Sequence, residues 1–143
     1  MTAQRTVGFV LAATLAVAAC RAIAPALYMH TSIGTGNWVA IEINGHTAAP
    51  ANQAQRPWLH FSMDTGIVTG SGGCNRLSGP VMINRSSLKF GALAMTRKAC
   101  TDSVLNAQEN EFVASLGVVD RYELSADTLI LFSGYDSKVR LGH

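Results

Sequence analysis

The sequence has little of what marks nucleic-acid-binding proteins. Only 14% of its 143 residues are charged and 7% are aromatic, whereas about 25% of a typical soluble protein is charged. The formal net charge is +2 at pH 7. So small a positive charge does not provide the basic surface that binds a phosphate backbone. We therefore expect no nucleic-acid partner.

No apolar run in the first twenty residues is long enough for a transmembrane helix, which needs about 20 apolar residues. Residues 7–19 form an uncharged, mostly apolar segment that follows Arg5 and ends in Ala18 and Ala19. A positive start, a short apolar run and small residues are typical of a secretion signal. We interpret residues 1–19 as a cleaved signal peptide. Its loss removes Arg5 and lowers the formal net charge from +2 to +1.

Cys20 directly follows the small residues of this segment, as in a bacterial lipobox, whose cysteine is acylated after cleavage. The alternative is an ordinary signal beside a chance cysteine. We favour lipidation of Cys20 because the pattern lies where the apolar run ends. Arg21, in place of aspartate, favours the outer membrane by analogy with other bacterial lipoproteins. A lipid anchor attaches a protein without a transmembrane helix, so we expect a location in the bacterial envelope, facing the periplasm.

Residues 20–36 have neither a helical nor a strand period, and they include Pro25, Gly34 and Gly36. Such a segment is typical of a flexible tether. Residues 37–143 are then expected to form one folded domain, a usual domain length.

Short segments between turn signals predict that this domain consists mainly of β-strands. Asn44-Gly45 is a strong hairpin-turn signal. Alternation in the first strand puts Trp38 and Ala40 on one face and Ile41 and Ile43 on the other. The remaining strands are expected in two hairpins, 58–71 and 81–91, which turn at 64–66 and 84–87, and in three later segments, 118–124, 127–134 and 138–142. The segment 127–134 is mostly apolar, which is compatible with burial on both faces.

One helix is predicted at about residues 102–116, where Leu105, Gln108 or Glu109, Phe112 and Leu116 recur at three- and four-residue steps. Gly117 suits the left-handed position after the last turn. Three residues can supply the N-cap oxygen: Thr101, Asp102 and Ser103. About eight short strands and one helix favour an α+β fold that is mainly antiparallel β, with a curled sheet or partly open barrel packed on the helix.

The glycine-rich stretch GSGGCNRLSGP, residues 70–80, lacks the groups that bind phosphate. A phosphate-binding loop continues from its glycines into Lys-Ser/Thr, but here Gly73 is followed by Cys74-Asn75-Arg76. We interpret its glycines and Asn75 as residues in positive-φ or crowded backbone positions at the end of a strand.

The sequence offers no convincing catalytic or metal site. A thiol nucleophile needs a nearby histidine, and a Cys74–His60 pair stays open without any support from the pattern. The two lone cysteines lack the Cys-x-x-Cys or paired-histidine spacing of a zinc site. Glu109 and Glu111 point to different faces of the helix and are interpreted as solvated. We expect no catalytic residue, no cofactor and no metal, and hence not an enzyme.

Two more features concern the cysteines. If Cys20 carries lipid, Cys74 and Cys100 remain, and an even number in an oxidising compartment predicts a disulfide. This bond would contribute on the order of 3 kcal/mol; two buried free thiols are the alternative. The adjoining segment 96–100, TRKAC, is either a solvated loop or a basic surface that meets an acidic partner or lipid headgroups.

Several motifs appear together in a recognisable order. They are Trp38 with Asn44-Gly45, the block Gly70-Ser71-Gly72-Gly73-Cys74-Asn75 with Ser78-Gly79, Leu88-Lys89-Phe90-Gly91, Thr96-Arg97-Lys98-Ala99-Cys100, Glu109-x-x-Phe112, and Tyr122, Leu124, Leu129 and Leu131. Together they resemble the META domain family of HslJ-like, heat-inducible envelope proteins. The resemblance covers most of residues 37–141 and implies a β-rich domain with one packed helix. Gly72, Gly73, Asn75, Gly79 and Thr96 would be its structural residues, with no catalytic residue among them.

The resemblance and the signal together favour a non-enzymatic, lipid-anchored envelope protein. Family members are linked to heat response, antibiotic resistance and virulence, so we expect a monomeric, stress-related or protein-interaction module with an envelope protein as partner. The alternative is a carrier of small apolar ligands, or a pilot-type lipoprotein chaperone, that uses a cleft between sheet and helix. A hydrolase or thiol enzyme is a third, weaker hypothesis.

Overall fold

The computed structural model describes residues 32–49 and 55–143. The interpreted signal peptide, Cys20 and residues 21–31 of the expected tether lie outside the described residues. Within the described ranges, no helix has the length and apolar character needed to cross a membrane.

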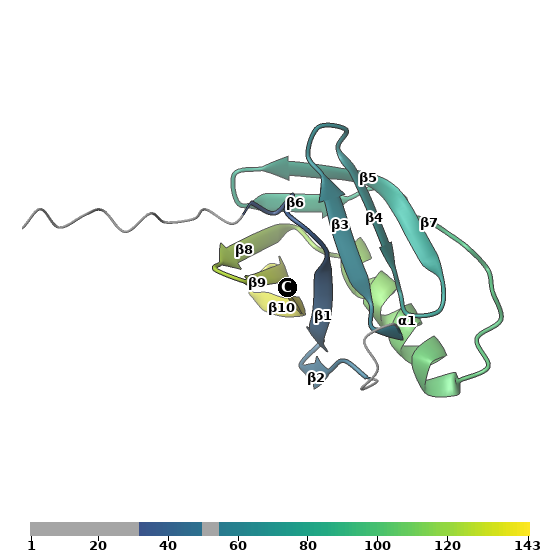
Figure 1. Cartoon of the computed structure of the whole chain (residues 1–143). Coiled ribbons are helices and arrows are strands. Elements are labelled where there is room, and N and C mark those ends of the chain that lie inside the picture. Colours follow the sequence, from purple (N-terminus) through teal and green to yellow (C-terminus); the bar gives the residue numbers. More distant parts are fainter. Residues whose placement is uncertain (1–31, 50–54) are drawn as a thin grey trace, which may run out of the picture.

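Ten strands and one helix make up this part of the chain (Figure 1). In chain order they are β1 (Trp38–Ile43), β2 (His46–Thr47), β3 (Trp58–Ser62), β4 (Ile67–Ser71), β5 (Arg76–Asn84), β6 (Ser87–Phe90), β7 (Ala94–Met95), α1 (Ser103–Gly117), β8 (Arg121–Ser125), β9 (Thr128–Ser133) and β10 (Asp136–Gly142).

Eight of the strands form a closed antiparallel barrel in the order β1-β3-β4-β5-β6-β8-β9-β10, and β10 pairs again with β1. β2 extends β1 outside this ring, and β7 pairs with the first half of β5. The predicted α+β, mainly antiparallel fold class is confirmed. Closure satisfies strand edges that would otherwise stay unpaired.

Local turn chemistry explains the three predicted hairpins, all of which are present. Asn44 and Gly45 both have positive φ, 46° and 82°, as a two-residue turn between antiparallel strands requires. Gly66, with φ 66°, ends the turn between β3 and β4, and Arg85, with φ 54°, lies in the turn between β5 and β6. The turns therefore depend on residues adjacent to each strand.

The first strand departs from simple alternation. The register between β1 and β10 shifts between Ala40 and Glu42, so Ile41 is an extra residue in β1. Such a bulge turns the following side chains to the opposite face. Ile43 is therefore buried with Trp38 and Ala40, while Ile41 is 44% exposed. The prediction that Ile41 and Ile43 share a face was wrong.

Apolar side chains fill the barrel, as expected for a ring of eight strands. Trp38 and Phe112 have no exposed surface, and Phe61 is only 1% exposed. α1 approaches β1 and β10 and, across the ring, β6, so it covers one end of the barrel. β9 buries alternate residues only, Leu129 and Leu131, and is therefore not buried on both faces.

The ends of α1 and the start of the packed structure refine the sequence prediction. Asp102 is the N-cap, because its side chain accepts hydrogen bonds from the backbone N–H groups of Val104 and Leu105. Gly117 is the last helical residue and lacks the expected positive φ. Ile33, in the expected tether, is buried, and its carbonyl accepts a hydrogen bond from Trp38 Nε1. Packed structure therefore includes Ile33.

Candidate functional site

The loop of residues 72–75 surrounds the carboxylate of Glu109. Glu109 lies on α1 and is 3% exposed. Its Oε2 accepts hydrogen bonds from the backbone N–H groups of Cys74, at 3.0 Å, and Asn75, at 2.6 Å. Its Oε1 accepts a third from Asn75 Nδ2 at 2.7 Å. The prediction of a solvated face was wrong for Glu109 and right for Glu111, which is exposed.

This geometry explains the composition of the glycine-rich loop. A buried carboxylate is costly unless donors satisfy it, and consecutive backbone N–H groups that converge on one point bind anions well. The loop therefore does bind an anionic group, but that group is a side chain of the same protein and not a phosphate.

Two of the predicted structural glycines are required by this arrangement. A Cβ at Gly72 would lie 2.5 Å from Cγ of Glu109 and 2.8 Å from its Oε2. Gly73 has φ +121°, and a Cβ there would lie 2.9 Å from the backbone oxygen of Gln55. Gly79 is further away along β5, where a Cβ would come within 2.6 Å of the Ala92 oxygen. All three are thus at crowded positions, as the sequence predicted, and Gly73 also has positive φ.

Asn75 connects this loop to the segment that precedes the helix. It is 6% exposed, and its Oδ1 accepts hydrogen bonds from Thr96 Oγ1, at 3.0 Å, and from the backbone N–H of Lys98, at 2.7 Å. Thr96 Oγ1 in turn accepts from the backbone N–H of Arg76 at 3.0 Å. We call Asn75, Thr96 and Glu109, with the loop 72–75, the buried polar network.

A disulfide joins the same segments. Cys74 and Cys100 are bonded, with their Cα atoms 6.0 Å apart, so the predicted pair is present. The bond consumes both thiols and leaves no Cys74 nucleophile for a dyad with His60. The His60 ring instead lies with Nδ1 2.9 Å from the Gly36 carbonyl oxygen.

Most of these residues were recognised from the sequence; Glu109 was noted in the Glu109-x-x-Phe112 motif, but its burial was not predicted. The available signal was its position on the helix, because Glu109 lies between Leu105 and Phe112 on the face that packs inward. A charged residue at such a position must find buried partners. Among the described residues, no cluster of three or more His, Cys, Asp or Glu side chains is placed to hold a metal ion.

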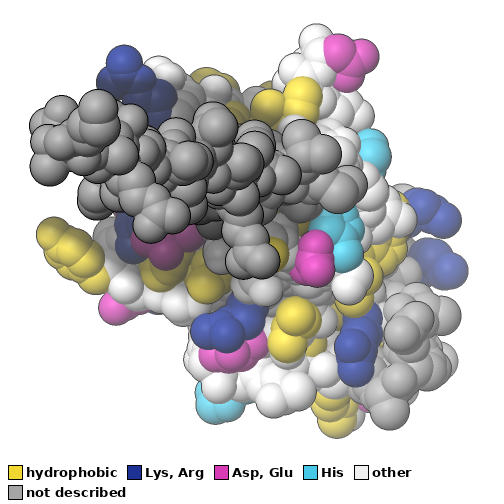
Figure 2. Space-filling model, turned by 60° about the vertical axis from the view of Figure 1, so that its left-hand side comes forward, with side chains coloured by type: hydrophobic (Ala, Val, Ile, Leu, Met, Phe, Trp, Pro, Cys, Tyr) yellow, Lys and Arg dark blue, Asp and Glu magenta, His cyan; other side chains and the backbone are white. Residues whose placement is uncertain are grey.

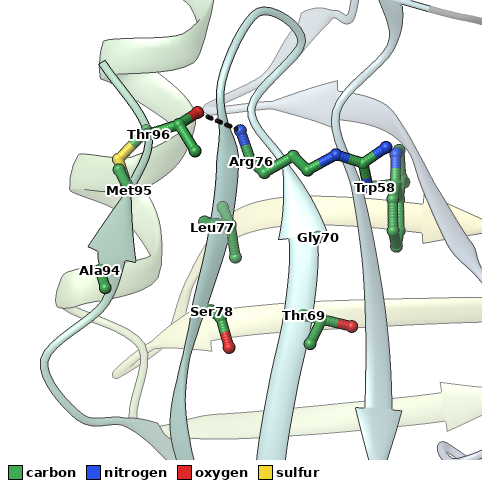
Figure 3. Close-up of a pocket in the computed structure, with 9 residues that line it drawn as sticks. All are labelled: Trp58, Thr69, Gly70, Arg76, Leu77, Ser78, Ala94, Met95 and Thr96. Carbon is green, nitrogen blue, oxygen red and sulfur yellow. Dashed lines mark hydrogen bonds between the residues drawn. The ribbon is translucent and has the colours of Figure 1, made fainter.

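A groove of about 600 Å³ lies on the outer surface of β3, β4, β5 and β7, and Glu109 is not among its lining residues (Figure 3). Trp58, Thr69, Arg76 and Met95 are among the residues that line it. A different face of the molecule, turned forward in Figure 2, shows basic side chains dispersed among acidic and hydrophobic ones where its atoms are coloured.

Comparisons with known proteins agree with this fold. No curated protein sequence matches the chain. Three solved structures are similar. An NMR structure is 25% identical, with a TM-score of 0.59, and the match covers 76% of this chain and 89% of the other. An NMR structure of a protein from Burkholderia xenovorans is 24% identical, with a TM-score of 0.62 and coverage of 77% of this chain and 82% of the other. A crystal structure of a duf4847 family protein from Bacteroides vulgatus ATCC 8482 is 17% identical, with a TM-score of 0.55 and coverage of 78% of this chain and 94% of the other.

The sequence profile of the META domain matches residues 31–141. This range includes the loop 72–75, the disulfide and α1, and it begins close to Ile33, where the packed structure is already present. The chain therefore belongs to the META domain family.

Proposed function

We propose that this protein is a non-enzymatic, lipid-anchored domain of the bacterial envelope that acts by binding an envelope protein under stress. The observation that carries the proposal is that the reactive side chains of the family motifs are bonded to other groups of the same domain and are not free for catalysis. Cys74 and Cys100 are bonded to each other, and the Glu109 carboxylate is occupied by three donors from the loop 72–75.

The anchor rests on the sequence, through Cys20 and the preceding small residues, and Arg21 favours the outer membrane. Cells grown with a radioactive fatty acid should label the protein and retain it in the membrane fraction. Cys20→Ala should lose both the label and the membrane association. Retention of both in the variant would contradict the anchor.

The closed barrel supports action as a monomer, because closure removes most of the free strand edges through which β proteins associate. The envelope partner is best sought by crosslinking in intact cells before and after heat stress, followed by purification of the full lipidated protein. Cys20→Ala is the matched control, since its domain is unchanged and its location is not. Recovery of the same crosslinked protein with both forms would show that binding does not need the anchor.

The packed interior weighs against the carrier alternative. Large side chains without exposed surface, including Trp38 and Phe112, occupy the space between the sheet and the helix. An apolar ligand would have to displace them, so we do not propose a carrier.

A further inference from the structure

Beyond the proposed function, we propose that the outer groove on β3, β4, β5 and β7 binds an acidic saccharide. The inference is independent of the lipid anchor and of the protein partner. The groove, of about 600 Å³, is within the range of small-molecule sites, about 300–1,000 Å³.

Strand register brings the groove residues together. Ser71 on β4 pairs with Trp58 on β3 and with Arg76 on β5, so Trp58 and Arg76 lie at one level on either side of β4. Figure 3 shows the Arg76 side chain extending across β4 toward the indole of Trp58. Two residues further along the strands, and on the same face, Thr69 pairs with Ser78. Their side chains are small, which leaves room for a flat ligand above the sheet.

Four of the five polar side chains that line the groove have no hydrogen-bond or ion-pair partner among the described residues; the fifth, Thr96, donates to Asn75 Oδ1. The hydroxyl groups of Thr69 and Ser78, Nε1 of Trp58 and the guanidinium of Arg76 make no hydrogen bond or ion pair there. The Arg76 group bonded to Thr96 is the backbone N–H. Four donor groups are therefore available at one surface beside an aromatic face.

The charge of the groove favours an anion. A second cavity, of about 420 Å³, shares Trp58, Arg76 and Thr96 with the groove and extends it toward Lys98. No Asp or Glu lines either cavity. Arg76 and Lys98 therefore face cavities that no described Asp or Glu lines, which favours an anionic ligand. A guanidinium can pair with a carboxylate through two parallel hydrogen bonds.

The backbone favours a saccharide over an extended peptide. A peptide that joins a sheet pairs with a free strand edge. Here β4 has β3 and β5 as neighbours, and the first half of β5 has β4 and β7. β7 pairs with β5 alone, but it is only two residues long and offers little edge to a peptide. Recognition therefore depends on side chains. The indole face of Trp58 stacks on the C–H face of a sugar ring, hydroxyl groups pair with Thr69 and Ser78, and a sugar carboxylate pairs with Arg76.

The test is an NMR titration of the full-length, isotope-labelled protein in a nonionic detergent with trigalacturonic acid, an acidic trisaccharide. We expect shifts at the Trp58 indole N–H and at Thr69 and Ser78, with the buried Trp38 indole unmoved. We expect a Kd of about 1 mM or tighter. A neutral galactotriose of the same linkage should bind at least about tenfold more weakly, since it cannot pair with Arg76.

Variants separate charge from stacking. Arg76→Gln should weaken trigalacturonate binding by about tenfold or more and change galactotriose binding by less than about threefold. Trp58→Ala should weaken both, and Trp58→Phe, which keeps an aromatic face, should retain part of the affinity if the alanine variant does not fold. Arg140→Gln is the matched control, because Arg140 is a partly exposed cation on β10 outside the groove.

Three outcomes would overturn the proposal. The first is no shift of the Trp58 indole at about 10 mM trigalacturonate. The second is equal loss of affinity in Arg140→Gln and Arg76→Gln, which would show nonspecific charge attraction. The third is binding of hexaglutamate to the same residues as tightly as trigalacturonate, which would show that the groove binds negatively charged ligands whether or not they contain a sugar ring.

Discussion

The buried carboxylate of Glu109 allows a sharp prediction about stability. Glu109→Ala removes the acceptor of three hydrogen bonds, from the backbone N–H groups of Cys74 and Asn75 and from Asn75 Nδ2. The loop also loses the side chain around which it is arranged. Because Glu109 is 3% exposed, water does not simply replace the carboxylate.

The magnitude follows from these donors. A buried donor left without its acceptor costs about 1–3 kcal/mol, and more where the acceptor was charged. Loss of one member of a buried charged interaction costs about 3–5 kcal/mol. The carboxylate itself no longer has to be desolvated, so the three losses do not simply add. We expect Glu109→Ala to lower the free energy of unfolding by about 3–5 kcal/mol.

The assay is urea unfolding of the full-length protein, disulfide intact, followed by circular dichroism. The midpoint should fall without a change in the m-value, since the surface exposed on unfolding is nearly the same. The melting temperature should fall by roughly 10–20 °C for a domain of this size. Glu109→Gln should also be destabilised, because its amide NH₂ group must face one of the loop donors.

Glu111→Ala is the matched control. Glu111 is an exposed carboxylate on the same helix, and its Oε1 accepts one hydrogen bond from Asn44 Nδ2 at 3.0 Å. Its loss should change stability by less than about 0.5–1 kcal/mol. A Glu109→Ala protein as stable as Glu111→Ala would refute the claim that the carboxylate holds the loop.

Three further outcomes are expected in the same unfolding assay. Gly72→Ala should lower the free energy of unfolding by about 1–3 kcal/mol, because its Cβ would contact the Glu109 side chain. The loss should be smaller in a protein that also carries Glu109→Ala, and an equal loss in both proteins would contradict this contact. Gly117→Ala should stabilise by up to about 1 kcal/mol, because Gly117 is helical and a Cβ there meets nothing within 4 Å; a destabilised variant would argue against this geometry. Replacement of Cys74 and Cys100 by alanine should cost about 3 kcal/mol, and an unchanged midpoint would show that the buried polar network alone fixes the loop.

The features that the sequence predicted correctly are those set by neighbouring residues. The turn at Asn44-Gly45 depends on two residues that tolerate positive φ. The helix begins directly after Asp102, because the side-chain oxygen of this N-cap residue satisfies free backbone N–H groups. Such interactions are local, so they are visible in a few consecutive letters.

The features that were missed depend on distant partners. The bulge at Ile41 arises from pairing with β10, whose residues lie almost 100 positions later. Gly117 suits a left-handed position, but the chain continues through Val118 in the right-handed region. Burial of Glu109 depends on where the loop 72–75 packs. In the sequence, the signals for it were its place between Leu105 and Phe112 on the helix and its part in the Glu109-x-x-Phe112 motif. Periodicity identified the inward face of the helix without identifying what that face contacts.

The position of the buried polar network also bears on where function must be sought. Three of the family motifs lie in separate segments, 70–79, 96–100 and 109–112, and the structure joins them through the disulfide and the hydrogen bonds of Asn75 and Glu109. Each partner needs the others: without the loop Glu109 would be a buried charge without donors, and without Glu109 the glycines would have no side chain to accommodate. These motifs therefore hold α1 and the segment that precedes it against the loop 72–75 of the barrel. The proposed saccharide site accordingly uses side chains that this network does not need, among them Trp58 and the Arg76 guanidinium on the outer face.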